Sequence, residues 1–467
     1  MMNRASAAPA ARTGWASLRD LTRYHWFVFV VAALGWLADC MDQQLFNLAR
    51  RDAVIELLNV DPRTEAGAKQ AAEWAGYSTS IFLLGWGAGG IAFGILGDRW
   101  GRVKTMLLTI WLYSLFTGLS ALSVSVYDFA LYRFLTGLGV GGEFAVGVAL
   151  VAEVMPPHIR PYMLGLLQAF SAIGNVTAAL LYMGVGWLEL RGTFEGLYVG
   201  GWGPITPWRG LFLIGTVPAV IAIIVRRRLK EPERWTEVAG SGTKPLGSYT
   251  ELFGTPRWRR HALLGLMLAF AGVVGLWGIA FFSIDLQKSI FEKLYAEQGV
   301  FGAEKAGWTK IWAGVTSIMI NVGAFFGMTG FSSLTARIGR RPTFAIAFVA
   351  AAASTIMVFL FMDDHLDLFW MLPIMGFCQL SLFGGYAIYF PELFPTRLRS
   401  TGTSFCYNVG RFVAAAGPTT LGLLQSQVFA GYAEPMRYAG VTMCAVYIVG
   451  LAALPFLPET RGEALPE

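Results

Sequence analysis

The sequence is poor in charge: only 14% of its 467 residues are Asp, Glu, Lys or Arg, whereas soluble domains carry about 25%. It also has only four cysteines and four histidines. Neither type occurs at metal-ligand spacing, and the cysteines form no disulfide pattern. No nucleophile–base set appears in the chain. These absences argue against a disulfide scaffold, a metal site and an enzyme, so we expect no catalytic residue and no cofactor.

Apolar residues dominate the chain instead, at 55%. They recur in continuous runs of about 20, the length that crosses a ~30 Å hydrocarbon core as a helix. Strands of a membrane barrel would alternate apolar and polar residues. We therefore predict an all-α integral membrane protein. Twelve spans are predicted, at 25–47, 76–96, 104–124, 127–152, 161–186, 208–226, 261–284, 308–331, 342–362, 367–390, 399–427 and 437–457.

Lys and Arg are distributed unevenly between the two faces that these spans would create. The face with both chain ends carries 23 of the 36, and the opposite face carries 11. Positively charged loops stay in the cytoplasm. We therefore expect a protein of the cell membrane with both termini cytoplasmic. Three connections on the opposite face, 48–75, 187–207 and 285–307, are long and suggest no function.

Short basic clusters lie at the ends of spans, as at Arg226–Arg228 and at Arg257, Arg259 and Arg260. Such clusters set topology and contact lipid headgroups. The surplus of six positive charges therefore requires no nucleic acid partner.

Two motifs occur twice. Asp-Arg-Trp-Gly-Arg at 98–102 returns as Ala-Arg-Ile-Gly-Arg at 336–340, 238 residues later. Glu-Val-Met-Pro at 153–156 returns as Glu-Leu-Phe-Pro at 392–395, 239 residues later. A shared offset indicates a duplicated six-span unit, an arrangement with the substrate site near the midplane between the halves. The predicted units are a tail at 1–24, a half at 25–226, a linker at 227–260, a half at 261–457 and a tail at 458–467.

The motif at 98–102 resembles the signature between the second and third spans of the major facilitator superfamily. The segment 133–142, Arg-Phe-Leu-Thr-Gly-Leu-Gly-Val-Gly-Gly, is similar to the second motif of that family. Residues 391–399 and 458–462 also match its patterns. The resemblance extends over nearly the whole chain and implies twelve transmembrane helices in two six-helix halves that operate by alternating access.

Within that superfamily, the chain is most similar to aromatic-acid and metabolite proton symporters, which are related to organic-anion transporters. Six matching charges carry this resemblance: Asp39 and Asp42 on span 1, Arg133 and Glu153 around span 4, and Arg399 and Arg411 on span 11. Cys40 stands where this group usually has glycine. The span-7 pattern of sugar porters and the span-5 Gly-Pro motif of drug antiporters are missing.

Four intramembrane charges are predicted to couple transport to protons: Asp39, Asp42, Arg133 and Glu143. A charge inside the bilayer costs at least ~2.5 kcal/mol and persists where it pairs or acts. Asp39 and Asp42 share one helical face because they are three residues apart. A neighbouring acid and a low-dielectric medium both favour proton binding. We expect Arg133 to lie level with Asp42. The alternatives are passive ion pairs and, for Glu143, a helix–helix hydrogen bond.

The substrate site is predicted from polar and aromatic residues near the midplane: Arg411, Asn408, Gln168, Asn175, Trp277 and Tyr386. The planar guanidinium of Arg411 can bind a carboxylate through two hydrogen bonds. Its alternative is a structural pair with Glu143. The aromatic side chains either line a pocket or pack in the core and against lipid.

A conformational latch on the cytoplasmic side is predicted from the repeated motifs: Asp98, Arg99, Arg102, Glu153, Arg160, Arg337, Arg340, Glu392 and Arg399. We expect Arg102 and Arg340 each to lie near the motif Glu of its own half. Asp98 is expected at the start of span 11, because a helix N-terminus favours negative charge. Ala336 replaces the second Asp, so the second cluster should be weaker.

Together these features predict a monomeric secondary transporter that carries a small organic anion, such as an aromatic or sugar acid, with protons. Its partners would be the carboxylate substrate, protons and the lipid bilayer. Two alternatives remain open. One is an uncoupled facilitator or exporter of a neutral metabolite or sugar. The other is a membrane sensor that has lost transport.

Overall fold

The computed structural model describes residues 14–61, 64–191, 206–217, 229–241, 245–280, 282–299, 302–414 and 416–466. The regular elements in these ranges are all helices, which agrees with the predicted fold class. Ten of the helical segments are long and apolar enough to cross a membrane. They coincide with predicted spans 1–5, 7–10 and 12. The sixth predicted span begins in a short helix and continues outside the described residues, and the eleventh contains several short helices.

The first half consists of α1 (Arg23–Leu58), α2 (Glu65–Arg99), α3 (Arg102–Ala121), α4 (Val126–Val154), α5 (Arg160–Leu190) and α6 (Pro207–Ile214), preceded by η1 (Gly14–Asp20). Side-chain caps fix where several helices begin. The Thr22 hydroxyl accepts from the His25 N–H at the start of α1, and the Ser125 hydroxyl accepts from the Asp128 N–H at the start of α4. These bonds satisfy backbone donors that have no partner within the helix.

The second half begins with α10 (Pro256–Val274), the π-helical turn η3 (Gly275–Ala280) and α11 (Phe282–Glu297). It continues with α12 (Gly302–Ile338), α13 (Arg340–Phe361), α14 (Leu368–Leu393), α15 (Arg399–Ala414), α16 (Gly417–Leu423), η6 (Leu424–Val428), α17 (Pro435–Met443), α18 (Val446–Ala453) and η7 (Leu454–Phe456). Single-turn helices η4 (His365–Asp367) and η5 (Thr396–Leu398) precede α14 and α15. The described part of the predicted linker holds α8 (Glu233–Ser241) and α9 (Tyr249–Gly254).

Two of the predicted long connections are largely helical, which corrects that expectation. Helices α1 and α2 extend through most of 48–75, and α11 and α12 through most of 285–307. Hydropathy detects only the apolar part of a helix, so polar turns that project beyond the hydrocarbon were counted as loop. Of the third connection, 192–205 lies outside the described residues.

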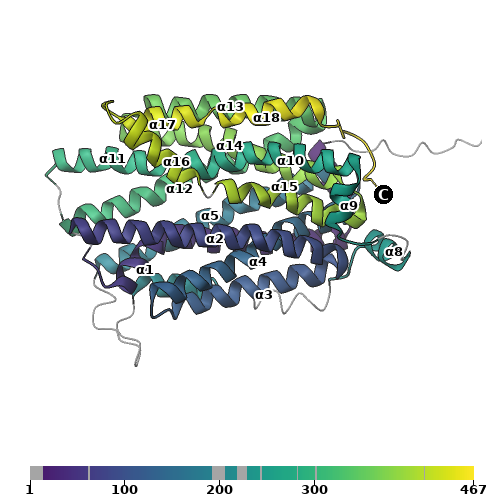
Figure 1. Cartoon of the computed structure of the whole chain (residues 1–467), viewed down its shortest axis with the longest axis horizontal. Helices are drawn as coiled ribbons and strands as arrows, with labels where there is room; N and C mark the ends of the chain where they lie inside the picture. Colours follow the sequence, from purple (N-terminus) through teal and green to yellow (C-terminus); the bar gives the residue numbers. More distant parts are fainter. Residues whose placement is uncertain are drawn as a thin grey trace, which may run out of the picture.

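Figure 1 shows the two halves as two groups of roughly parallel helices, with α1–α4 on one side and α13, α14, α17 and α18 on the other. Helices α2 and α5 of the first half pack against α15 and α12 of the second. The C-terminus, α8 and α9 lie at one end of the bundle (Figure 1). We call this the linker end and the opposite one the far end.

The repeated motif makes the same helix start in both halves. Gly101 and Gly339, just before α3 and α13, have φ values of 118° and 99°, which favour glycine over any L-residue. A glutamate carboxylate then accepts the first free N–H groups of each helix: Glu231 those of α3 and Glu459 those of α13. A negative charge is favourable at a helix N-terminus. In each half, a glutamate that follows the last span therefore caps the helix that begins after the motif glycine.

Candidate functional site

A cavity lies between the two halves, with about 90 Å³ of space for the centres of water molecules. Helices α1, α2 and α5 form one side, and η3, α12, α14 and α15 form the other. Its aromatic residues are Trp36, Trp86, Trp277, Phe383 and Tyr407, and its polar residues are Gln43, Gln44, Gln168, Ser171, Asn175, Ser317 and Asn321. Arg411 is the one charged residue among those that line it. Such a wall fits a small, partly apolar anion.

Arg411 is held by its own helix and by aromatic rings. Its Nη1 donates to the Tyr407 carbonyl oxygen at 2.5 Å and to Asn408 Oδ1 at 3.2 Å. The guanidinium carbon lies 4.1 Å from the Trp86 ring centre and 4.3 Å from that of Tyr407. Its Nε has no hydrogen-bond partner among the described residues. The rings thus fix the plane of the guanidinium and leave Nε free to donate.

Two other arginines in this protein bind a carboxylate through Nε and Nη2. Arg102 donates from Nε and Nη2 to the two oxygens of Glu153, at 3.3 and 2.9 Å. Arg340 does the same to Glu392, at 3.0 and 2.8 Å. Paired donation of this kind is strong and directional. The free Nε of Arg411 is therefore suited to an incoming carboxylate.

Trp277 reaches the cavity from η3, where the helix from α10 widens into a π-helical turn. Such turns often mark functional sites because the extra residue redirects side chains. The Trp277 and Trp86 rings meet edge to face, with centroids 5.9 Å apart. Trp277 therefore closes the aromatic side of the cavity near Arg411.

Two hydrogen bonds join the halves around the cavity. Asn175 Nδ2 donates to Asn321 Oδ1 at 2.9 Å, and Gln44 Nε2 donates to Ser317 Oγ at 3.1 Å. All four side chains line the cavity. Each bond is neutral, and such bonds contribute only about 0.5–1.5 kcal/mol. The contacts on this side are therefore weak enough to separate when a substrate enters.

The structure brings three predicted substrate residues to the cavity along with Arg411: Gln168, Asn175 and Trp277. The prediction was wrong for Asn408 and Tyr386, because neither side chain lines the cavity. Asn408 Nδ2 instead donates to the Gly141 carbonyl oxygen, which ties α15 to α4 and positions Arg411. The Tyr386 hydroxyl donates to the Leu268 carbonyl oxygen at 2.8 Å, inside the second half.

The predicted contact between α1 and α4 is present. Arg133 Nη1 lies 3.8 Å from Asp42 Oδ2, and both side chains are fully buried. Arg133 also donates to Ser120 Oγ at 2.7 Å, and the Phe212 ring covers its guanidinium at 4.8 Å. The two charges compensate each other, but at 3.8 Å they form no hydrogen bond, and Arg133 Nη1 and both Asp42 oxygens have no hydrogen-bond partner among the described residues.

Asp39 and Glu143, unlike Asp42, form no ion pair among the described residues. Both are buried, at 1% and 2% exposure, and none of their carboxyl oxygens has a hydrogen-bond partner among the described residues. The Glu143 carboxyl lies against Gly35, one turn before Asp39. Glu143 and Arg411 are both close enough to act electrostatically on Asp39. No Arg411–Glu143 ion pair occurs among the described residues. Two unpartnered acids therefore lie next to the cavity-lining Cys40.

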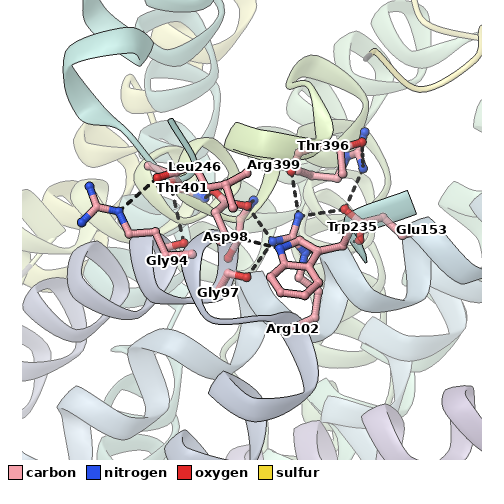
Figure 2. Close-up of polar contacts among 12 residues, drawn as sticks. Gly94, Gly97, Asp98, Arg102, Glu153, Trp235, Leu246, Thr396, Arg399 and Thr401 are labelled. Atoms are coloured by element: carbon pink, nitrogen blue, oxygen red, sulfur yellow. Dashed lines mark hydrogen bonds and ion pairs between the residues drawn. The ribbon is translucent and has the colours of Figure 1, made fainter. Parts of the chain in front are cut away.

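At the linker end, a charged cluster joins the halves (Figure 2). Arg102 Nη1 lies 2.8 Å from Asp98 Oδ1, and its Nη2 donates to Glu153 at 2.9 Å. The Asp98 carboxylate accepts from the N–H groups of Ser400 and Thr401, at 3.1 and 2.8 Å. The expected contacts of Arg102 and Asp98 are therefore both present.

Arg399 connects this cluster to the second half. Its Nη1 donates to Glu153 Oε1 at 2.7 Å, so one carboxylate binds an arginine from each half. Arg102 also donates to the Thr396 carbonyl oxygen at 2.7 Å (Figure 2). All three charged side chains are fully buried. Breaking such a buried pair costs about 3–5 kcal/mol, so the cluster holds the linker end closed.

The second cluster forms but stays within its own half. Arg340 pairs with Glu392 at 2.8 Å, as expected, and Thr460 donates to the other Glu392 oxygen at 2.6 Å. Arg160, the counterpart of Arg399, is buried beside Glu392, and no ion pair between them is found in the described ranges. Because no arginine crosses to Glu392 in these ranges, this cluster does not join the halves, which agrees with a weaker second latch.

Arg99 and Arg337 are both exposed and lie outside the clusters, which corrects their predicted role. Arg99 Nε donates to the Leu246 carbonyl oxygen at 3.0 Å, so it binds the linker instead. The Arg337 side chain makes no ion pair or hydrogen bond within the part of the chain that the structure describes. Each precedes the motif glycine by two residues and therefore points away from the buried side.

The linker makes contacts with the latch that were not predicted from the sequence. Trp235 Nε1 donates to the Asp98 carbonyl oxygen at 2.7 Å (Figure 2). Arg397 pairs with Glu251 at 2.8 Å. The sequence does contain a pattern that could have predicted part of this role. Leu-Lys-Glu at 229–231 and Leu-Pro-Glu at 457–459 each follow the last span of a half, and their glutamates cap α3 and α13. The linker therefore covers the latch rather than only connecting the halves.

We expect Arg399→Gln to open the linker end. Glu153 would keep only Arg102, and a lost hydrogen bond to a charged group is worth about 1.5–3 kcal/mol, so the open population should rise roughly tenfold to a hundredfold. Cys40 lines the cavity and reports this change. Its alkylation by a membrane-impermeant maleimide, added from the linker side of oriented vesicles, should accelerate accordingly. Arg337→Gln is the matched control, and an unchanged Cys40 rate in Arg399→Gln would contradict the latch.

Comparisons with known proteins agree with this geometry. A sequence model of the Major Facilitator Superfamily matches residues 33–418. A Cupriavidus pinatubonensis protein described as a probable 4-methylmuconolactone transporter is 29% identical, covering 92% of this chain and 90% of its own. The cis,cis-muconate transport protein of Acinetobacter baylyi is 28% identical, covering 80% and 83%. The solved proton:xylose symporter XylE, bound to 6-bromo-6-deoxy-D-glucose, is 18% identical with a TM-score of 0.72, covering 95% and 98%.

Proposed function

The chain belongs to the major facilitator superfamily, and from this premise we propose that it carries a small unsaturated or aromatic carboxylate across the membrane together with protons. Members of this family are transporters and not enzymes, and their fold has twelve transmembrane helices in two halves. The observation that supports the anion is Arg411, a fixed positive charge in the wall of the cavity. Arginine keeps its charge at any relevant pH, so it serves as a counter-ion.

The walls of the cavity favour a flat substrate. The Trp86 and Tyr407 rings both lie against the Arg411 guanidinium, and Trp277 meets Trp86 edge to face. A substrate whose carboxylate binds the Nε side of the Arg411 guanidinium would place its conjugated carbons against these rings. The amides of Gln168 and Asn175 are available for a second polar group. Two similar proteins are named for the transport of 4-methylmuconolactone and of cis,cis-muconate, and the second is an unsaturated dicarboxylate.

Proton coupling is proposed for Asp39 and Glu143. A buried acid with no hydrogen-bond partner is most stable when it holds a proton, because an isolated carboxylate is poorly solvated in the membrane. Arg411 lines the cavity and Asp39 precedes the cavity-lining Cys40, so the positive charge of Arg411 would stabilise a charged Asp39. An anion bound to Arg411 would offset that positive charge and favour protonation. Substrate and proton would then bind together, which is the requirement for symport.

The direction of access follows from the closed latch. We propose that the linker end faces the cytoplasm, because the basic excess lies there. The cavity then loads from outside while the cluster of Arg102, Glu153 and Arg399 closes the inside. Release requires that cluster to separate. The neutral hydrogen bonds around the cavity would then hold the halves together in its place.

The test is accumulation by the purified chain in liposomes. A thermal-shift screen with aromatic, sugar and dicarboxylic acids first identifies a ligand, which should also protect Cys40 from alkylation. Each pH unit is worth about 1.4 kcal/mol, so an acid exterior two units below the interior supports roughly hundredfold accumulation at one proton per anion. A protonophore should abolish it.

Other results would select other functions. Equilibration without accumulation, at any imposed gradient, would favour an uncoupled facilitator. Binding of a neutral sugar with no effect of carboxylates would remove Arg411 from the substrate site. A folded chain that neither binds nor moves any acid in the screen would favour a sensor.

A further inference from the structure

A groove on the surface of α10 at the linker end takes no part in the transport site. Two adjoining hollows of about 560 and about 510 Å³ lie between the start of α10 and the segment after α18. They share Pro256, Arg260 and Phe456, and Arg257 and Arg259 line one hollow each. We call this feature the arginine groove. It lies at the end of α10 where the apolar part of that helix begins.

The positive charge of the groove is uncompensated. Arg257, Arg259 and Arg260 are all exposed. Among the described residues none of them forms an ion pair, and Arg257 has only a ring contact, 4.8 Å above Trp258. Most other arginines at the linker end described above pair with an acid or a carbonyl oxygen. Three like charges within four residues repel one another, so a bound anion would relieve that repulsion.

An exposed apolar strip continues from these charges toward the middle of the membrane. Leu263 and Met267 follow Arg260 at helical spacing, with 47% and 38% exposure. Phe456 forms the opposite wall and is 58% exposed. A ligand that fits both parts has a negative head and a long apolar chain.

We propose that the arginine groove binds one anionic phospholipid, with its phosphate at Arg257 and Arg260 and an acyl chain along Leu263 and Met267. Basic pockets between transmembrane helices recognise such headgroups. A zwitterionic lipid has no net charge to offset the arginines, and free phosphate has no chain for the apolar strip. The site is separate from the cavity, so it does not depend on the proposed transport function.

Native mass spectrometry of the full-length protein tests this with phosphatidylglycerol and phosphatidylcholine of identical acyl chains. Each arginine near an anionic lipid contributes roughly fivefold in affinity, so the wild type should prefer phosphatidylglycerol by at least about tenfold. The double variant Arg257→Gln/Arg260→Gln should lose that preference. Arg23→Gln is the matched control, because Arg23 is the exposed arginine at the start of α1, the counterpart of α10 in the first half.

Each outcome decides the question. A double variant that keeps the preference, or a wild type without one, overturns the proposal. Displacement of the lipid by inorganic phosphate alone would show a soluble-anion site instead. If the double Gln variant is poorly folded, the single variants Arg257→Gln and Arg260→Gln replace it, and each should lose part of the preference. Melting temperatures in the absence of lipid separate folding from binding, and no transport measurement enters the result.

Discussion

Replacing Arg411 with alanine should weaken binding of the carboxylate substrate roughly tenfold to a hundredfold, because a hydrogen bond to a charged group is worth about 1.5–3 kcal/mol. The free Nε of Arg411 is the donor that this estimate concerns. Arg411→Lys keeps the charge but loses the planar fork that lies against Trp86 and Tyr407. It should recover only part of the affinity. Equilibrium binding to the purified variants measures both effects.

The control for this result is folding. Were Arg411 a structural partner of Glu143, then Glu143→Gln would reduce yield and melting temperature as much as Arg411→Ala. No such ion pair is found in the described part of the chain, so we expect Glu143→Gln to fold normally. A well-folded Arg411→Ala protein that binds its anion as tightly as the wild type would exclude Arg411 from the site.

Asp39→Asn and Glu143→Gln should each abolish accumulation driven by a pH gradient and leave counterflow exchange partly intact. Both substitutions fix the side chain in an uncharged form, so no proton is carried with the substrate. The roughly hundredfold accumulation expected at two pH units would fall to equilibration. Because the two acids lie together, the double variant should behave like either single one. Uptake and counterflow in the same liposome preparation measure this.

Asp42→Asn provides the comparison. It leaves Arg133 buried without its counter-ion, and a broken buried pair costs about 3–5 kcal/mol. We therefore expect a lower melting temperature, with coupling retained in the folded fraction. If Asp42→Asn alone loses accumulation while Asp39→Asn and Glu143→Gln retain it, the proton is carried by the Asp42–Arg133 pair.

The latch could be predicted from sequence because its charges are fixed by helix ends. Gly101 and Gly339 mark where two helices begin, and Glu153 and Glu392 mark where two others end. The ends of adjacent spans meet on one side of a membrane, so the motif spacing was enough to pair Arg102 with Glu153. Arg337 was misplaced because the motif shows which residues recur but not which of them face inward.

Residues in the middle of spans were harder to place. Asn408 and Tyr386 are polar at mid-span, like Gln168, yet they face neighbouring helices rather than the cavity. The direction in which a side chain points depends on how its helix is rotated against its neighbours, and a single span does not determine this. The π-helical turn that brings Trp277 to the cavity adds a local rotation that regular helical periodicity cannot anticipate.

The unequal clusters of the two halves have a consequence for the speed of the transport cycle. Two identical halves would place two arginines across the interface, Arg399 on Glu153 and Arg160 on Glu392. Here only the first crossing exists within the described residues. Each crossing would add to the activation barrier for inward opening, and every 1.4 kcal/mol slows a step about tenfold. A chain in which Arg160 also crossed to Glu392 would therefore be expected to open inward more slowly than this one.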